Sequence, residues 1–147
     1  MADKQQLSDS MLKKNVVVGL GEIGNPILKL LSRNEIVVGY DINKKLTDEK
    51  KLLRYEKYPT NFLHICIPFG KKFYSQIISL NKKFNPSCIV IHSTIKPGTT
   101  KKLQLKLKIP IIYSATRGVH KRMLFDLKRY TKFFAIGNNA PRKKWAS

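Results

Sequence analysis

The chain has 147 residues, a length that suits one compact domain, and 42% of them are hydrophobic, as in globular proteins. No apolar run approaches the ~18 residues that a membrane span requires, so we expect no membrane-spanning segment. The formal net charge of +20 comes mostly from lysine doublets scattered along the chain. Arginine, the better reader of phosphates and bases, is sparse, so specific nucleic-acid recognition is disfavoured.

Residues 1–13 form a polar tail without the apolar stretch of a secretory signal, so we expect a cytoplasmic protein. The two cysteines, Cys66 and Cys88, lie in apolar segments and lack CxxC spacing. We therefore expect two buried, reduced thiols and no metal site.

From Asn15 onward, short β-branched runs alternate with amphipathic stretches, which predicts strands alternating with helices. Pro26 lies in the first turn of the first helix, where proline is tolerated. The expected strands are Val16–Val18, Glu35–Tyr40, Phe62–Ile67, Cys88–Ile91, Ile109–Tyr113 and Phe133–Ile136. The expected helices are Ile23–Leu31, a short one around Lys50–Arg54, Lys71–Lys82, Pro97–Leu105 and a short one over Met123–Tyr130.

This alternation predicts an α/β fold with mainly parallel strands joined by right-handed crossovers. Six strands with a glycine turn after the first match the Rossmann doubly wound sheet, with strand order 3-2-1-4-5-6. We expect this domain to span residues 14–137. Residues 138–147 resemble a turn followed by the start of a helix, which suggests either a stand-alone domain or a fragment of a longer enzyme.

The turn after the first strand carries the pattern GxGxxG over Gly19, Leu20, Gly21, Glu22, Ile23 and Gly24. In this pattern Gly19 permits the tight turn, Gly21 lets a pyrophosphate approach the backbone, and Gly24 lets helix and strand pack closely. Free N–H groups at the helix start would face the phosphates. The pattern predicts a dinucleotide site, although the same fold also occurs with an empty or vestigial one.

Asp41 ends the second strand, 22 positions after Gly19, where an acidic side chain accepts hydrogen bonds from the ribose hydroxyls. This favours NAD as the cofactor, with Ile42 and Asn43 as further cofactor-binding residues. Lys44 and Lys45 are cations that could tolerate the 2′-phosphate of NADP, but Asp41 would repel that phosphate.

Two further strand ends point toward the same edge of the sheet, where ligands bind in open α/β folds. We expect Pro68 and Phe69 to wall the adenosine side, and Ser93 and Thr94 to reach the nicotinamide ribose or amide. Ordinary loop and helix-cap chemistry is the alternative for Ser93 and Thr94. His64, inside the third strand, is interpreted as structural.

The run His92–Thr100, which reads His-Ser-Thr-Ile-Lys-Pro-Gly-Thr-Thr, resembles the Ser-Thr-hydrophobic-x-Pro-Gly-Thr segment of the UDP-glucose/GDP-mannose dehydrogenase family. The glycine turn and the strand ends Tyr40-Asp41 and Cys66-Ile67-Pro68 are also similar to that family's NAD-binding domain. The resemblance covers about residues 14–137 and implies NAD-dependent oxidation of a sugar nucleotide. The wider superfamily includes 6-phosphogluconate and 3-hydroxyacid dehydrogenases.

The chain departs from the family after the fifth strand, where a glutamate-containing segment is replaced by Ser114–His120. The family's catalytic cysteine and lysine lie in domains that would follow this chain. Thr94, Arg117 and His120 are the catalytic candidates, because Arg117 could hold an anionic substrate and His120 could transfer protons. A solvated loop is the alternative for Arg117 and His120.

These observations predict an NAD-binding domain of a dehydrogenase, without the second catalytic domain and inactive alone. A stand-alone NAD- or nucleotide-binding module without turnover is the alternative, and a basic nucleic-acid-associated protein is a third class. A nucleotide sugar or another anionic small molecule is the expected substrate class, and a homo-oligomer stays open.

Overall fold

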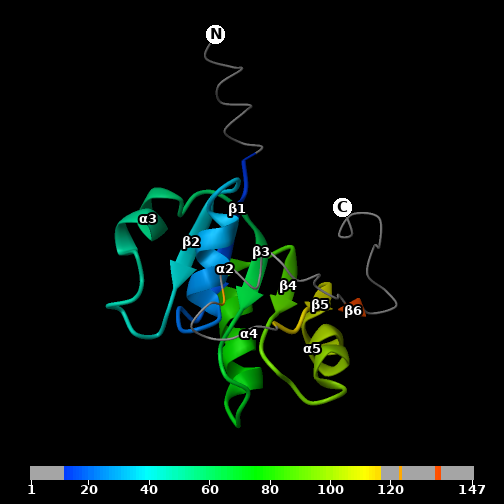
Figure 1. Ribbon diagram of the computed structural model, residues 1–147. Helices are drawn as coiled ribbons and strands as arrows, with labels where there is room; N and C mark the ends of the chain where they lie inside the picture. The colour runs from blue at the N-terminus through cyan, green and yellow to red at the C-terminus, as the bar shows by residue number, and fades with distance from the viewer. Residues whose placement is uncertain (1–11, 117–122, 124–134, 137–147) are drawn as a thin grey trace.

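The computed structural model describes residues 12–116, residue 123 and residues 135–136. Strands and helices alternate along the described chain, as Figure 1 shows by label. The strands are β1 (Lys14–Val18), β2 (Val37–Tyr40), β3 (Thr60–Ile65), β4 (Cys88–Ile91), β5 (Ile111–Tyr113) and β6 (Ala135–Ile136). The helices are α2 (Gly24–Leu31), α3 (Glu49–Arg54), α4 (Phe73–Phe84) and α5 (Thr99–Leu107).

Several expected segments lie outside the described residues: the tail before Leu12, most of the helix expected over Met123–Tyr130, and residues 137–147. Among the helices that are described, none is both long and apolar enough to cross a membrane.

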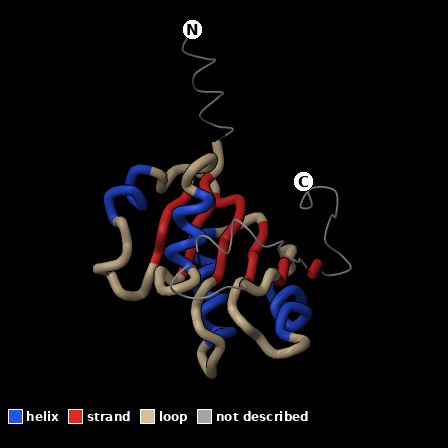
Figure 2. Tube along the Cα trace, viewed as in Figure 1, coloured by secondary structure: helices blue, strands red, loops and turns tan. Residues whose placement is uncertain are grey.

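The strands form one sheet in the order β2-β1-β3-β4-β5-β6, in which β1 to β5 are parallel and β6 is antiparallel to β5. The α/β class and the mainly parallel sheet are therefore confirmed (Figure 2). The predicted order 3-2-1-4-5-6 is wrong, because β3 pairs with β1 instead of lying outside β2. The order 2-1-3-4-5 is that of flavodoxin-like sheets.

The handedness of the crossovers explains where the helices lie. From β1 to β2 the chain moves one way through α2, and from β3 through β4 to β5 it moves the opposite way through α4 and α5. A right-handed crossover places its helix on opposite faces for opposite directions. Strands β1 and β3 therefore flank the point where the chain reverses, and beyond their carboxyl ends such sheets bind ligands.

Alternating side chains divide the core between the two faces of the sheet. One cluster joins alternate residues of the central strands to the apolar side of α4 and α5; its buried members are Val16, Val18, Leu63, Ile65, Phe73, Ile77, Leu80, Ile89, Ile91, Leu103 and Ile111. On the other face, Val17 and Val37 pack with Ile27 of α2. The sheet is therefore covered by α2 on one face and by α4 and α5 on the other.

Lys14 belongs to one of the lysine doublets, and lysine side chains are rarely buried, but it is only 5% exposed. Its Nζ donates hydrogen bonds to the carbonyl oxygens of Tyr55 and Tyr58, both at 2.8 Å, and of Glu56 at 3.2 Å. Burial lowers the pKa of Lys14, and the Glu56 carboxylate opposes that shift. Because α3 buries none of its own residues, these hydrogen bonds help to hold the connection between α3 and β3 against the sheet.

Helices α4 and α5 each begin two residues after their predicted start. Lys72 is the N-cap of α4, and Gly98, the N-cap of α5, has a φ of 85°. A residue in the left-handed backbone conformation, such as Gly98, cannot be part of a right-handed helix. Pro97 therefore lies before α5 rather than inside it. Strand β4 has the predicted bounds.

Candidate functional site

The turn between β1 and α2 requires two of its glycines. Gly19 has a φ of 89°, and a Cβ there would lie 2.9 Å from the backbone carbonyl carbon of Cys66. A Cβ on Gly24 would lie 1.6 Å from the carbonyl oxygen of Gly19, closer than any real contact. The first glycine thus permits the turn and the last lets α2 begin directly against it, as the sequence pattern predicts.

Gly21 differs from both neighbours. A Cβ added at this residue would meet no atom within 4 Å, and its backbone φ is not in the left-handed region. Nothing in the folded chain therefore requires glycine at this position. The residue also lines a cavity of about 790 Å³. The absence of a side chain there leaves the backbone open to whatever occupies that cavity.

The carboxylate of Asp41 joins the end of β2 to the glycine turn. Oδ2 accepts a hydrogen bond from the Leu20 N–H, and Oδ1 accepts one from the Asn43 N–H, both at 2.8 Å. The Thr47 hydroxyl donates to the Asp41 carbonyl oxygen and accepts from its N–H. An ionised carboxylate has about four acceptor positions, so roughly two remain for a ligand.

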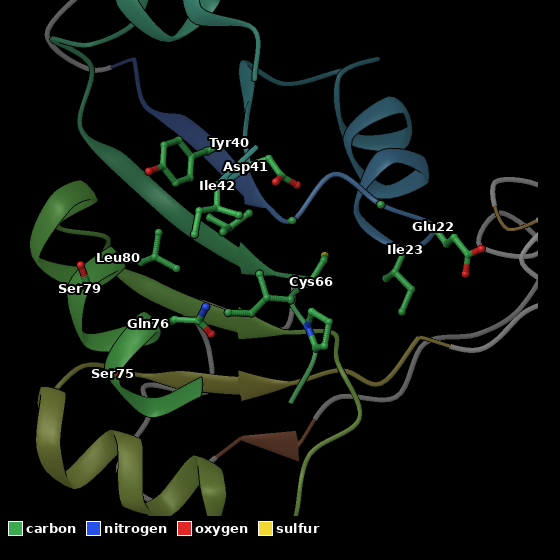
Figure 3. Close-up of a pocket in the computed structure, with 15 residues that line it drawn as sticks. Glu22, Ile23, Tyr40, Asp41, Ile42, Cys66, Ser75, Gln76, Ser79 and Leu80 are labelled. Carbon is green, nitrogen blue, oxygen red and sulfur yellow. The ribbon is translucent and has the colours of Figure 1, made fainter. Parts of the chain in front are cut away.

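The cavity has a volume of about 790 Å³ and lies beyond the carboxyl ends of β1, β2 and β3. Figure 3 shows it with the glycine turn at one end and α4 at the other. Its lining comprises Val18, Gly19, Gly21, Glu22, Ile23, Tyr40, Asp41, Ile42, Cys66, Ile67, Pro68, Ser75, Gln76, Ser79 and Leu80. Of the predicted cofactor residues, the lining contains Gly19, Gly21, Glu22, Ile23, Asp41, Ile42 and Pro68. Leu20, Gly24 and Asn43 do not line the cavity.

The α4 end of the cavity combines apolar surface with one amide. Tyr40, Ile42 and Leu80 lie at that end in Figure 3, and the Gln76 side chain extends from α4 toward the middle of the cavity. Ile42 is 88% exposed. Sequence reasoning missed every α4 residue of this lining. The inward stripe Phe73, Ile77 and Leu80 was detectable from its period, but the period does not show which strand ends a helix faces.

Two predicted cofactor residues serve packing instead. The Phe69 ring packs on Phe73 and Tyr74, with centroids 5.1 and 6.4 Å apart, and lies against the core beside α4 and α5. Ser93 is 5% exposed, and its hydroxyl donates to the Ile67 carbonyl oxygen, which ties the end of β4 to the end of β3. Neither residue lines the cavity, and neither does the exposed Thr94.

The two histidines of this region form a buried pair. His64 Nδ1 lies 2.9 Å from His92 Nε2, and the rings stack with centroids 5.2 Å apart. One nitrogen must donate and the other accept, so at least one ring nitrogen of the pair carries a proton between β3 and β4. The pair is polar packing within the sheet, which agrees with the structural interpretation of His64.

The catalytic candidates Arg117 and His120 lie outside the described residues. Within the described part of the chain, no group of three or more His, Cys, Asp or Glu side chains is arranged to hold a metal ion.

The cysteines are in no disulfide, although the strands that carry or precede them are neighbours. Strands β3 and β4 are neighbours, and Phe62 pairs with Cys88. Cys66 lies four residues beyond Phe62, so about 13 Å of strand separates the two cysteines. A disulfide requires Cα atoms within about 7 Å.

We expect the two thiols to differ sharply in reactivity. Cys66 is half-buried at the cavity, whereas burial raises the pKa of the Cys88 thiol to about 12, which leaves almost no thiolate at pH 8. Alkylation with iodoacetamide followed by peptide mass spectrometry should label Cys66 and spare Cys88. In denaturant both should be labelled. Labelling of Cys88 in the folded protein at a rate similar to Cys66 would contradict its burial.

The site therefore combines the glycine turn, the Asp41 carboxylate and a cavity that is apolar at its α4 end. It lies where the strand order of the parallel sheet reverses. Comparison of the chain with protein-family models and with curated proteins finds no match, so its own residues carry the functional argument.

Proposed function

We propose that this chain binds NAD in the cavity at the carboxyl ends of β1, β2 and β3, as the NAD-binding domain of a dehydrogenase resembling nucleotide-sugar dehydrogenases. The observation that carries the proposal is Gly21: it faces open space at a cavity, between two glycines that the fold itself demands. The absence of a side chain at Gly21 would let a pyrophosphate lie directly against the backbone.

The lining residues fit the parts of the dinucleotide in order. The start of α2 would receive the pyrophosphate through the Ile23 and Gly24 N–H groups, since the Asn25 N–H donates to the Gly21 carbonyl oxygen and Pro26 has no N–H. The unused acceptor positions of Asp41 would receive the ribose hydroxyls. Ile42 and Leu80 would sandwich the adenine ring, and the Gln76 amide has the donor and acceptor pair that matches an adenine edge. When bound, NAD supplies the hydride-accepting nicotinamide.

We expect NAD to bind at least about tenfold more tightly than NADP, because the Asp41 carboxylate accepts from hydroxyls and repels a 2′-phosphate. Calorimetric titration of both cofactors measures the difference. In Asp41→Asn the preference should fall to about threefold or less, since the charge is removed while one carbonyl acceptor remains.

Asp48→Asn is the matched control, because Asp48 caps α3 outside the cavity and its loss changes the net charge equally. It should keep the preference of the unaltered chain. Equal or tighter binding of NADP by the unaltered chain would mean that Lys44 and Lys45 outweigh Asp41.

A binding module without turnover is the second candidate, and one observation favours it. No Asp or Glu occurs between Glu56 and Asp126, so the ends of β4 and β5 carry no carboxylate to act as a general base. NADH absorbance with UDP-glucose and GDP-mannose separates the candidates: sustained NADH formation supports the dehydrogenase, and NAD binding without it supports the module.

A further inference from the structure

The charges of this chain are divided unevenly between its two halves. All six carboxylates of the described residues lie between Glu22 and Glu56, where they offset most of the Lys and Arg residues. From residue 57 to residue 116 there are ten lysines and no Asp or Glu. The second half of the sheet, with its two helices, is therefore a region of uncompensated positive charge.

Most of these lysines gather around one pair of helices. Helices α4 and α5 lie side by side on the same sheet face: the Tyr74 hydroxyl donates to Thr99 Oγ1 at 3.4 Å, and Lys102 Nζ lies 4.8 Å from the centroid of the Tyr74 ring. We define the lysine face as the exposed lysines of these helices and their flanking turns: Lys71, Lys72, Lys82, Lys83, Lys96, Lys101, Lys102, Lys106 and Lys108.

Among the described residues, the opposite side of the sheet shows no such excess. Around α2 the charges are Lys29 and Arg33 against Glu22 and Glu35, which balance. A basic composition by itself would spread lysine and carboxylate alike over both faces. The excess of lysine over carboxylate therefore lies on the α4 and α5 side of the sheet, and the basic composition alone does not explain this placement.

The lysine face offers mainly charge. Both helices bury most of their apolar side chains against the sheet through Phe73, Ile77 and Leu103. The large apolar side chains they leave exposed are Ile78 and Leu105, one on each helix, too few to insert that surface into a bilayer. The aromatic Tyr74 is half-buried beneath Lys102, so it provides no platform on which unpaired bases could stack. Lysine ammonium groups act as point charges that contact phosphates without reading bases.

We propose that the lysine face binds double-stranded nucleic acid through its backbone phosphates, independently of base sequence. A duplex carries about one charge per 1.7 Å, the densest array of fixed phosphates that such a face could meet. Along α4, the Lys71–Lys72 and Lys82–Lys83 pairs are about 16 Å apart, given the helical rise per residue. Each lysine that neutralises a phosphate releases condensed counterions, so binding weakens steeply with salt.

The test compares two charge-matched variants of the full chain. The first replaces Lys71, Lys82, Lys101 and Lys106 of the lysine face with Gln; the second replaces Lys13, Lys29, Lys50 and Lys51, outside it, with Gln. Fluorescence anisotropy with a mixed-sequence DNA duplex of about 20 bp, at about 50 to 200 mM KCl, gives affinity and salt slope. Both variants should keep the far-UV circular dichroism of the unaltered chain.

We expect the first variant to bind at least about tenfold more weakly at about 50 mM KCl and to lose about 3 to 4 units of salt slope, near 0.9 per contact. The second should change the slope by less than about 1. Equal losses in both would assign binding to overall charge and overturn the proposal. Absence of duplex binding by the unaltered chain would also overturn it, as would binding only to phosphatidylserine vesicles.

Discussion

Gly21→Val should weaken NAD binding by about 100-fold or more while the domain stays folded. The valine branches would occupy the space beside the start of α2 and remove about two charge-assisted hydrogen bonds to the pyrophosphate, each worth about 1.5 kcal/mol or more. The fold should tolerate the change, because a Cβ at this position meets nothing within 4 Å and the backbone φ lies outside the left-handed region. Calorimetric titration with NAD measures the affinity.

Gly70→Val provides the matched control. Gly70 also faces open space without a left-handed φ, but it precedes α4 and does not line the cavity. It should bind NAD as the unaltered chain does, and both variants should keep the same circular-dichroism spectrum and melting temperature within about 3 °C. Unaltered NAD affinity in folded Gly21→Val would exclude this turn as the pyrophosphate site.

Gly24→Ala should reduce the free energy of unfolding by more than about 3 kcal/mol, at the upper end of overpacking effects. Its Cβ would lie 1.6 Å from the carbonyl oxygen of Gly19 and 3.2 Å from the Cβ of Cys66. The first of these atoms belongs to a backbone held by the Gly19 N–H bond to Tyr40, so it cannot move aside as a side chain would. Helix α2 must therefore shift away from β1.

Urea denaturation followed by circular dichroism measures this loss, and the melting temperature should fall by about 10 °C or more. Gly21→Ala, three residues earlier in the same turn, should change the unfolding free energy by less than about 1 kcal/mol, since glycine-to-alanine changes at unstrained positions are mild. If both substitutions had the same small effect, the close approach of α2 to the turn would be wrong.

The sequence by itself determined those features that depend on neighbours along the chain. The unit of β1, α2 and β2 is one right-handed crossover, so β2 had to pair with β1 and bring Asp41 beside the glycine turn. The requirement for glycine at Gly19 and Gly24 could also be predicted from the sequence, because the turn and the close packing of the following helix involve residues that are near one another in the chain.

Tertiary structure decided everything that depends on which strand lies next to which. The alternation of helices and strands is the same whether β3 lies outside β2 or on the far side of β1. The hydrophobic period shows which residues are buried, but it does not show which element they pack against. Once β3 pairs with β1, α4 covers the switch point and Gln76 reaches the cavity, while Phe69 and Ser93 turn to packing. Lys14 is buried for the same reason: the return into β3 places three carbonyl oxygens around its ammonium group, a long-range arrangement that no local pattern encodes.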